Sequence, residues 1–119
     1  MSCFLTRTDA INFCLSFDNV FEDYPFDDDN WTVMRHKDNK KIFACIFRRN
    51  EKIWINIKSR PEWGDFLRKV YPSVVPAYHM NKKHWNSIIL DSTVPDEEIK
   101  NMICESYMLT SHKKNNYSV

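Results

Sequence analysis

The spacing of hydrophobic and polar positions along the chain predicts three helices and five strands. In the first helix, Ile11, Cys14 and Leu15 share one face, after a capping pair formed by Thr6 and Asp9. An acidic stretch over 18–30 follows and indicates a loop. Alternation of apolar and polar side chains then predicts a three-strand meander over residues 31–36, 41–48 and 52–58.

The middle strand of this meander is apolar on both faces, which is typical of a strand at the centre of a sheet. Strict alternation places on one face Ile42, Ala44 and Ile46, and on the other Phe43, Cys45 and Phe47. The next strand is predicted to point inward with Ile53, Ile55 and Ile57, and outward with Trp54, Asn56 and Lys58.

The second helix has the strongest start signal, an S-x-x-E capping box of Ser59 and Glu62 with Pro61 in the first turn. Its apolar stripe is predicted to be core and consists of Trp63, Phe66, Leu67, Val70 and Tyr71. Alanine at Phe66 or Leu67 is therefore expected to cost about 2–5 kcal/mol.

The last part of the chain predicts a short extended piece over 75–80, a strand over 84–90 and a final helix that begins near Pro95. The buried stripe of that helix is predicted to be Ile99, Met102, Ile103 and Tyr107. The order α-β-β-β-α-β-β-α indicates an α+β fold, a two-layer sandwich whose antiparallel sheet is covered by helices. We expect one domain over 1–119, with 113–119 as a flexible tail.

Composition excludes several classes of protein. The chain is 43% hydrophobic and 14% aromatic, which excludes disorder, and its single glycine, Gly64, excludes a glycine-rich phosphate loop. It has neither a signal peptide nor an apolar run near the ~20 residues of a membrane helix, so we expect a cytoplasmic protein without a membrane role. The spacing of Cys3, Cys14, Cys45 and Cys104 favours reduced, buried thiols over a disulfide or ligand role.

Charge is balanced in total, at +1, and uneven along the chain. Residues 1–34 carry one basic and seven acidic side chains, whereas residues 35–85 carry 13 basic and four acidic ones. The middle segment can therefore create a local positive field. The alternative is a solvated basic surface that the acidic segment neutralises after folding.

A basic sheet surface with an interleaved tryptophan is the first candidate site. Cations that follow phosphates, a stacking ring and an amide at a base edge are what nucleic acid requires. The predicted residues are Arg35, Lys37, Lys40, Lys41, Arg48, Arg49, Lys52, Trp54, Asn56 and Lys58, with Lys82 and Lys83 as a second basic turn. In the alternative interpretation Trp54 is packed in the interior and the lysines only solubilise the chain.

Metal and catalytic sites have weak support. His79 and His84 have no third ligand beside them, and the aspartates over 27–29 match no calcium loop. No nucleophile and base can be placed together, so we predict no enzyme activity, no cofactor and no metal. No small-molecule substrate is identified from the sequence.

The segment Pro76-Ala-Tyr-His-Met-Asn-Lys-Lys-His-Trp85 resembles the MmcQ/YjbR family of small bacterial proteins. Weaker matches in the family's order are Asp23-Tyr24-Pro25-Phe26, Lys41-Ile42-Phe43-Ala44, Ile57-Lys58, Tyr71-Pro72-Ser73-Val74-Val75 and Glu105-Ser106-Tyr107. Glycines usual in the family's turns are absent: Ser73 and Ser92 stand in their places.

The resemblance implies an α+β sandwich similar to type III secretion chaperones and to the "double wing" DNA-binding domain of a phage transcription factor. It therefore implies a DNA-binding protein whose basic wings contact phosphates with low sequence specificity. That implication rests on fold similarity alone. The alternative is a protein-interaction or chaperone-like module, with a homodimer or another protein as its partner.

Overall fold

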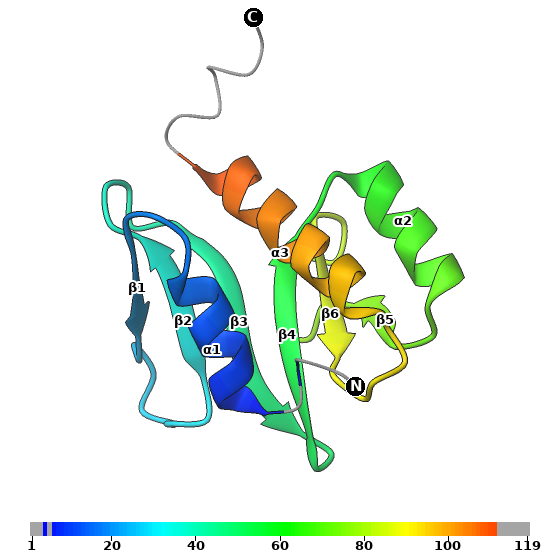
Figure 1. Cartoon of the computed structure of the whole chain (residues 1–119), viewed down its shortest axis with the longest axis horizontal. Helices are drawn as coiled ribbons and strands as arrows, with labels where there is room; N and C mark the ends of the chain where they lie inside the picture. Colours follow the sequence, from blue (N-terminus) through cyan, green and yellow to red (C-terminus); the bar gives the residue numbers. More distant parts are fainter. Residues whose placement is uncertain (1–3, 5, 112–119) are drawn as a thin grey trace, which may run out of the picture.

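The computed structural model describes residue 4 and residues 6–111. It is a six-stranded antiparallel sheet with three helices on one side (Figure 1). The sheet order is β1-β2-β3-β4-β6-β5, so β1 and β5 form its edges. The predicted α+β sandwich is confirmed, whereas the predicted flexible tail over 113–119 lies outside the described residues.

The elements follow one another as α1 (Arg7–Leu15), β1 (Val20–Asp23), β2 (Thr32–His36), β3 (Ile42–Arg49), β4 (Lys52–Lys58), α2 (Pro61–Val70), β5 (Val74–Pro76), β6 (Trp85–Ile89) and α3 (Asp96–Thr110). The predicted order missed β1. Its sequence VFED offers only a short alternation within an acidic stretch, and pairing with β2 is what holds it extended.

Local signals explain how the helices begin. The predicted capping box of α1 is present, with the Thr6 side chain accepting from the Asp9 backbone and the Asp9 carboxylate accepting from the Thr6 backbone. The predicted capping box of α2 is wrong: its N-cap is Arg60, no side chain caps it, and Ser59 is buried before the helix. Pro61 occupies the first turn, as predicted.

A β-bulge in β3 changes which residues face the helices. Met34 pairs with Ala44, and Arg35 pairs with Ile42, so Phe43 is the extra residue. Phe43 packs on the helix side against Phe17 and Tyr107, with ring centroids 5.9 and 5.4 Å away. The predicted strict alternation over 41–48 is therefore wrong at its beginning.

Ser106 of α3 satisfies the backbone at this bulge. Its hydroxyl donates to the Phe43 carbonyl at 2.6 Å and accepts from the Lys58 backbone N–H at 2.8 Å. Ser106 thereby joins both β3 and β4 to α3. The Phe43 carbonyl, which the bulge removes from the strand ladder, gains a hydrogen-bond partner. The predicted buried stripe of α3 is confirmed for Ile99, Met102 and Ile103.

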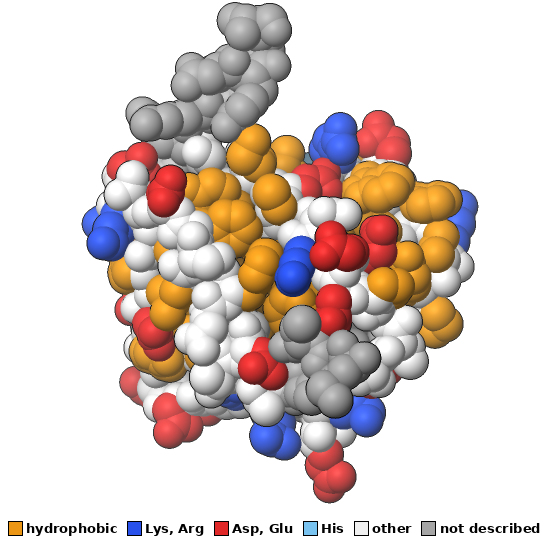
Figure 2. Space-filling model, viewed as in Figure 1, with side chains coloured by type: hydrophobic (Ala, Val, Ile, Leu, Met, Phe, Trp, Pro, Cys, Tyr) orange, Lys and Arg blue, Asp and Glu red, His pale blue; other side chains and the backbone are white. Residues whose placement is uncertain are grey.

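The apolar stripe of α2 is mostly exposed, contrary to the prediction. Leu67 is buried in the core, but Trp63, Phe66 and Val70 are 40%, 50% and 45% exposed. The rings of Trp63 and Phe66 stack on each other at 5.1 Å. Figure 2 shows hydrophobic side chains gathered over this helix. An amphipathic pattern identifies the apolar side of a helix, but only tertiary packing decides how much of that side is covered.

Replacement of Leu67 with alanine is expected to lower the free energy of unfolding by about 2–5 kcal/mol, because it opens a cavity in the core. Replacement of Phe66 is expected to cost less than about 1 kcal/mol, since half of its surface already faces solvent. Urea denaturation followed by circular dichroism checks both values. Equal losses for the two variants would contradict this placement of α2.

Candidate functional site

Within residues 4 and 6–111, two loops and no helix cover the second face of the sheet. One loop spans 24–31 between β1 and β2, and the other spans 77–84 between β5 and β6. We call this surface the loop face. Strand register places on it Val33, Cys45, Phe47, Trp54, Asn56 and Ser87. Two of the predicted site residues, Trp54 and Asn56, therefore lie beneath loops.

Asn56 anchors the loop over 77–84 and is fully buried. Its amide donates to the Tyr78 carbonyl at 2.9 Å and its carbonyl oxygen accepts from the Ser87 hydroxyl. The same hydroxyl accepts from the Tyr78 backbone N–H at 3.0 Å. The predicted base-reading role of Asn56 is wrong, because the amide group is engaged within the protein.

Trp54 is only 7% exposed, so the prediction that its ring is available for stacking is also wrong. Phe47 and Tyr78 pack against the ring, with centroids 5.9 and 6.4 Å away. The guanidinium of Arg49 lies 4.8 Å from the Trp54 centroid and 4.3 Å from the Tyr78 centroid. Arg49 therefore forms cation–π contacts that close this end of the loop face.

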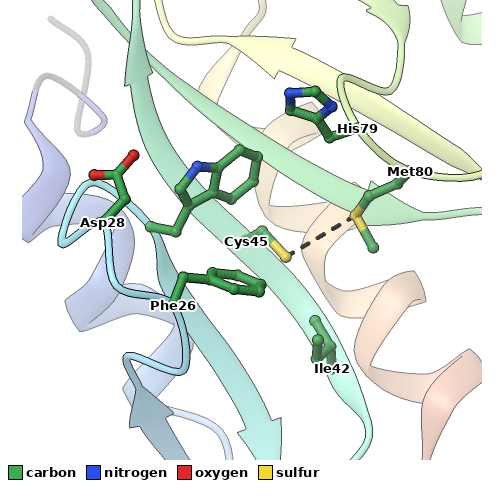
Figure 3. Close-up of a pocket in the computed structure, with 7 residues that line it drawn as sticks. Phe26, Asp28, Ile42, Cys45, His79 and Met80 are labelled. Carbon is green, nitrogen blue, oxygen red and sulfur yellow. Dashed lines mark hydrogen bonds between the residues drawn. The ribbon is translucent and has the colours of Figure 1, made fainter.

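A cavity of about 380 Å³ remains where the two loops approach each other. Its lining is Phe26, Asp28, Trp31, Ile42, Cys45, His79 and Met80. Figure 3 shows Phe26 and Asp28 on one side and His79 and Met80 on the other, with Cys45 between them. Most of the wall is apolar, and the polar groups are one carboxylate, one imidazole and one thiol.

The two buried thiols, of Cys45 in the cavity and Cys14 in the core, are poorly suited to nucleophilic chemistry. The Cys45 thiol contacts Met80 Sδ at 4.0 Å, and burial raises the pKa of Cys45 to about 12. Burial likewise raises the pKa of Cys14 to about 12. Both thiols are therefore protonated near neutral pH and unreactive. Cys104 is exposed, contrary to the prediction, and Cys3 lies outside the described residues.

The predicted cations separate to opposite ends of the sheet. Strand register places one group, which we call the basic end, beside the β2–β3 turn: Lys37, Lys40, Lys41, Lys58, Lys82 and Lys83. The β3–β4 turn carries Arg48, Arg49 and Lys52 at the other end. Arg35 lies beside the first group, since it pairs with Ile42 and its guanidinium donates to the Lys40 carbonyl at 2.9 Å. It also forms an ion pair with Asp23 at 2.8 Å.

The acidic segment folds over only part of the basic surface. The aspartates of 27–29 belong to a loop that Asn30 fixes at the β3–β4 end of the sheet. The Asn30 side chain donates to the Arg48 carbonyl and accepts from the Arg48 N–H, each at 2.9 Å. These aspartates therefore lie close to the second group of cations. The three described ion pairs involve Arg35, Arg60 and Arg68, and none involves the basic end.

The cavity is the feature that sequence reasoning missed. Its lining joins residues from three separate segments, and pairing of distant strands decides which of them meet. The sequence held one indication of the cavity. Phe26 and His79 belong to the segments 23–26 and 76–85, and both segments carry the family resemblance.

Over residues 4 and 6–111, no three His, Cys, Asp or Glu side chains are grouped as a metal site requires. Among the helices of the same residues, none has the length and apolar character needed to cross a bilayer.

The fold and the order of its motifs agree with the family named from the sequence. The YjbR family model matches residues 15–109, and the chain belongs to that family. Protein YyaQ of Bacillus subtilis is 35% identical over 117 residues, covering 89% of this chain and 98% of YyaQ. Protein YjbR of Escherichia coli is 25% identical over 103 residues, covering 87% of this chain and 85% of YjbR. Both relatives are uncharacterised.

Solved structures show the same fold. Protein DR2400 of Deinococcus radiodurans superposes with a TM-score of 0.84 at 31% identity, covering 95% of this chain and 83% of DR2400. A protein from Pseudomonas syringae superposes with a TM-score of 0.80 at 29% identity, covering 89% of this chain and 99% of its own. The six-stranded sheet described above is therefore the family's fold.

Proposed function

We propose that this protein binds duplex nucleic acid, DNA in the first instance, through the phosphate backbone and with low sequence specificity. The observation that carries the proposal is the basic end, where six lysines from three separate segments are brought together. Lys37, Lys41, Lys82 and Lys83 are exposed, and none of the six takes part in a described ion pair. The Lys40 and Lys82 ammonium groups donate to the Lys37 and Ala77 carbonyls, which leaves their charge uncompensated. Lysines without acidic partners can attract phosphates.

The spacing within the basic end suits a polyanion. Strands β3 and β6 are two positions apart in the sheet, which separates the β2–β3 turn and the start of β6 by about 10 Å. Contacts at this separation reach more than one phosphate. The burial of Trp54 and Asn56 leaves the predicted surface without its stacking ring and base-reading amide, so the proposed contacts are to the backbone.

The triple variant Lys37→Glu/Lys41→Glu/Lys83→Glu is expected to weaken binding of a labelled mixed-sequence duplex by at least tenfold at low salt, because it reverses three charges at the basic end. Fluorescence anisotropy at several salt concentrations measures the effect. For the native chain, affinity is expected to fall steeply with salt, with a slope of about −0.9 per phosphate contacted. The slope of the variant is expected to be shallower.

The matched control is Arg48→Glu/Lys52→Glu/Lys69→Glu, which changes the net charge by the same amount on exposed residues outside the basic end. We expect it to weaken binding by less than about threefold. Absence of duplex binding by the native chain at low salt would contradict the proposed function. Equal losses for the two triple variants would contradict the assignment to the basic end.

A protein-interaction module is the second candidate, and the exposed stripe of α2 favours it. Trp63 and Phe66 form a stacked pair that is 40% and 50% exposed, and apolar surface of this kind is enriched where proteins associate. Salt separates the two candidates. Phosphate binding weakens as salt rises, whereas association through apolar side chains does not.

A further inference from the structure

We propose that the cavity of the loop face binds a small organic cation, an amine or quaternary ammonium group attached to an apolar or aromatic body. This inference is independent of the basic end. It rests on the wall of the cavity, on the single carboxylate within that wall and on the way in which the aromatic residues are held.

The wall is suited to an apolar body. Phe26 and Trp31 lie edge to face with centroids 6.2 Å apart, and Ile42 and Met80 contribute apolar side chains. The volume of about 380 Å³ falls in the lower part of the ~300–1,000 Å³ range of small-molecule sites. Phe26 is 54% exposed and His79 is exposed as well, so the cavity has an accessible rim.

The aromatic wall is formed before any ligand binds. Trp31 stacks on the buried ring of Phe47 at 4.1 Å and lies parallel to the Tyr78 ring at 6.3 Å. The Asn56–Ser87 pair holds the Tyr78 backbone in place. A fixed indole face needs little reordering when it receives a cation, and tryptophan is the best aromatic partner for one.

The charge of the cavity favours a cation over an anion. Among the described residues that line the cavity, Asp28 carries the only carboxylate, His79 contributes an imidazole, and none is a lysine or arginine. One of its oxygens accepts from the Asn30 backbone N–H at 2.8 Å, and Asp28 takes part in none of the ion pairs found among the described residues. Asp28 itself is exposed, so its carboxylate lies at the rim of the cavity, and Asp27 and Asp29 beside it are exposed as well. Arg49 is held on the Trp54 and Tyr78 rings and does not belong to the lining.

The test uses benzyltrimethylammonium as the probe, with benzyl alcohol as an uncharged comparison and phenylacetate as an anionic one. Titration calorimetry of the full chain is expected to show saturable binding of the ammonium, at least tenfold tighter than that of either comparison compound. Quenching of tryptophan fluorescence gives a second readout, and the variant Trp31→Phe is expected to lose most of it.

Asp28→Asn is expected to weaken ammonium binding by about fivefold, because it removes the charge of an exposed carboxylate that solvent partly screens. The amide oxygen can still accept from the Asn30 N–H, so the loop keeps its turn, and an unchanged thermal midpoint verifies this. The matched control is Asp29→Asn, which removes the same charge from the same loop outside the lining and is expected to change affinity less than threefold.

Three results would overturn the proposal: no saturable binding of the ammonium, equal or tighter binding of phenylacetate or benzyl alcohol, or the same loss for Asp28→Asn and Asp29→Asn. Duplex binding is measured separately with the lysine variants of the basic end. Failure of either proposal is therefore distinguishable from failure of the other.

Discussion

Replacement of Phe47 with alanine is expected to lower the free energy of unfolding by about 3–5 kcal/mol. The Phe47 ring is fully buried and contacts three other rings, with centroids at 4.1 Å for Trp31, 5.7 Å for Tyr78 and 5.9 Å for Trp54. Its removal leaves a void under both loops, which cannot close without moving them. Urea denaturation, analysed at a common m-value, measures the loss.

Phe26→Ala is the matched control for this prediction, since it also removes a phenyl ring that contacts Trp31. Phe26 is more than half exposed, and its loss is expected to cost less than about 1 kcal/mol. A small effect at Phe47 would mean that the loops do not cover this face of the sheet in solution.

Replacement of Asn56 with alanine is expected to cost about 2–4 kcal/mol, because it leaves the Tyr78 carbonyl and the Ser87 hydroxyl with a lost partner in a buried site. The loop over 77–84 should open more often as a result. Hydrogen exchange at the Tyr78 amide measures that opening, and denaturation measures the stability.

Asn101→Ala provides the comparison, since Asn101 is exposed on α3 and alanine favours helix. Its effect on stability is expected to be within about 0.5 kcal/mol. If the two asparagine variants were equally stable, the side chain of Asn56 would not be the anchor of the loop.

Several features that depend on neighbouring residues were predictable from the sequence, although the equally local capping box expected for Ser59 and Glu62 is absent. The capping box of Thr6 and Asp9 involves residues three apart, and the stripe of Ile99, Met102 and Ile103 repeats within one helix. Both are present because the interactions that create them are local. The class of the fold followed from the order of such elements.

Features that depend on distant pairing were not predictable. Trp54 and Asn56 were assigned to an exposed surface because alternation distinguishes two faces of a strand without showing what covers each of them. Here loops from both halves of the chain cover the second face. The bulge at Phe43 is similar, since nothing in the apolar run from Ile42 to Phe47 marks where the alternation breaks.

The candidate site likewise has a part that was predictable from the sequence and a part that was not. The total charge of residues 35–85 was evident from composition, but its separation into two ends depended on the register of β3, β4 and β6. The position of the acidic loop depended on the contacts of Asn30 with Arg48, residues 18 apart in the chain. The lysines of the basic end could therefore be identified from the sequence, but their common position on one surface could not.

The two edges of the sheet bear on how the protein behaves at high concentration. β1 has only four residues, two of them the acids Glu22 and Asp23, and β5 has three and ends at Pro76, which has no N–H to donate. Short, charged or proline-terminated borders are poor templates for a strand from another molecule. Such borders discourage intermolecular β-pairing and fibril growth, even though the central strands are rich in isoleucine and phenylalanine.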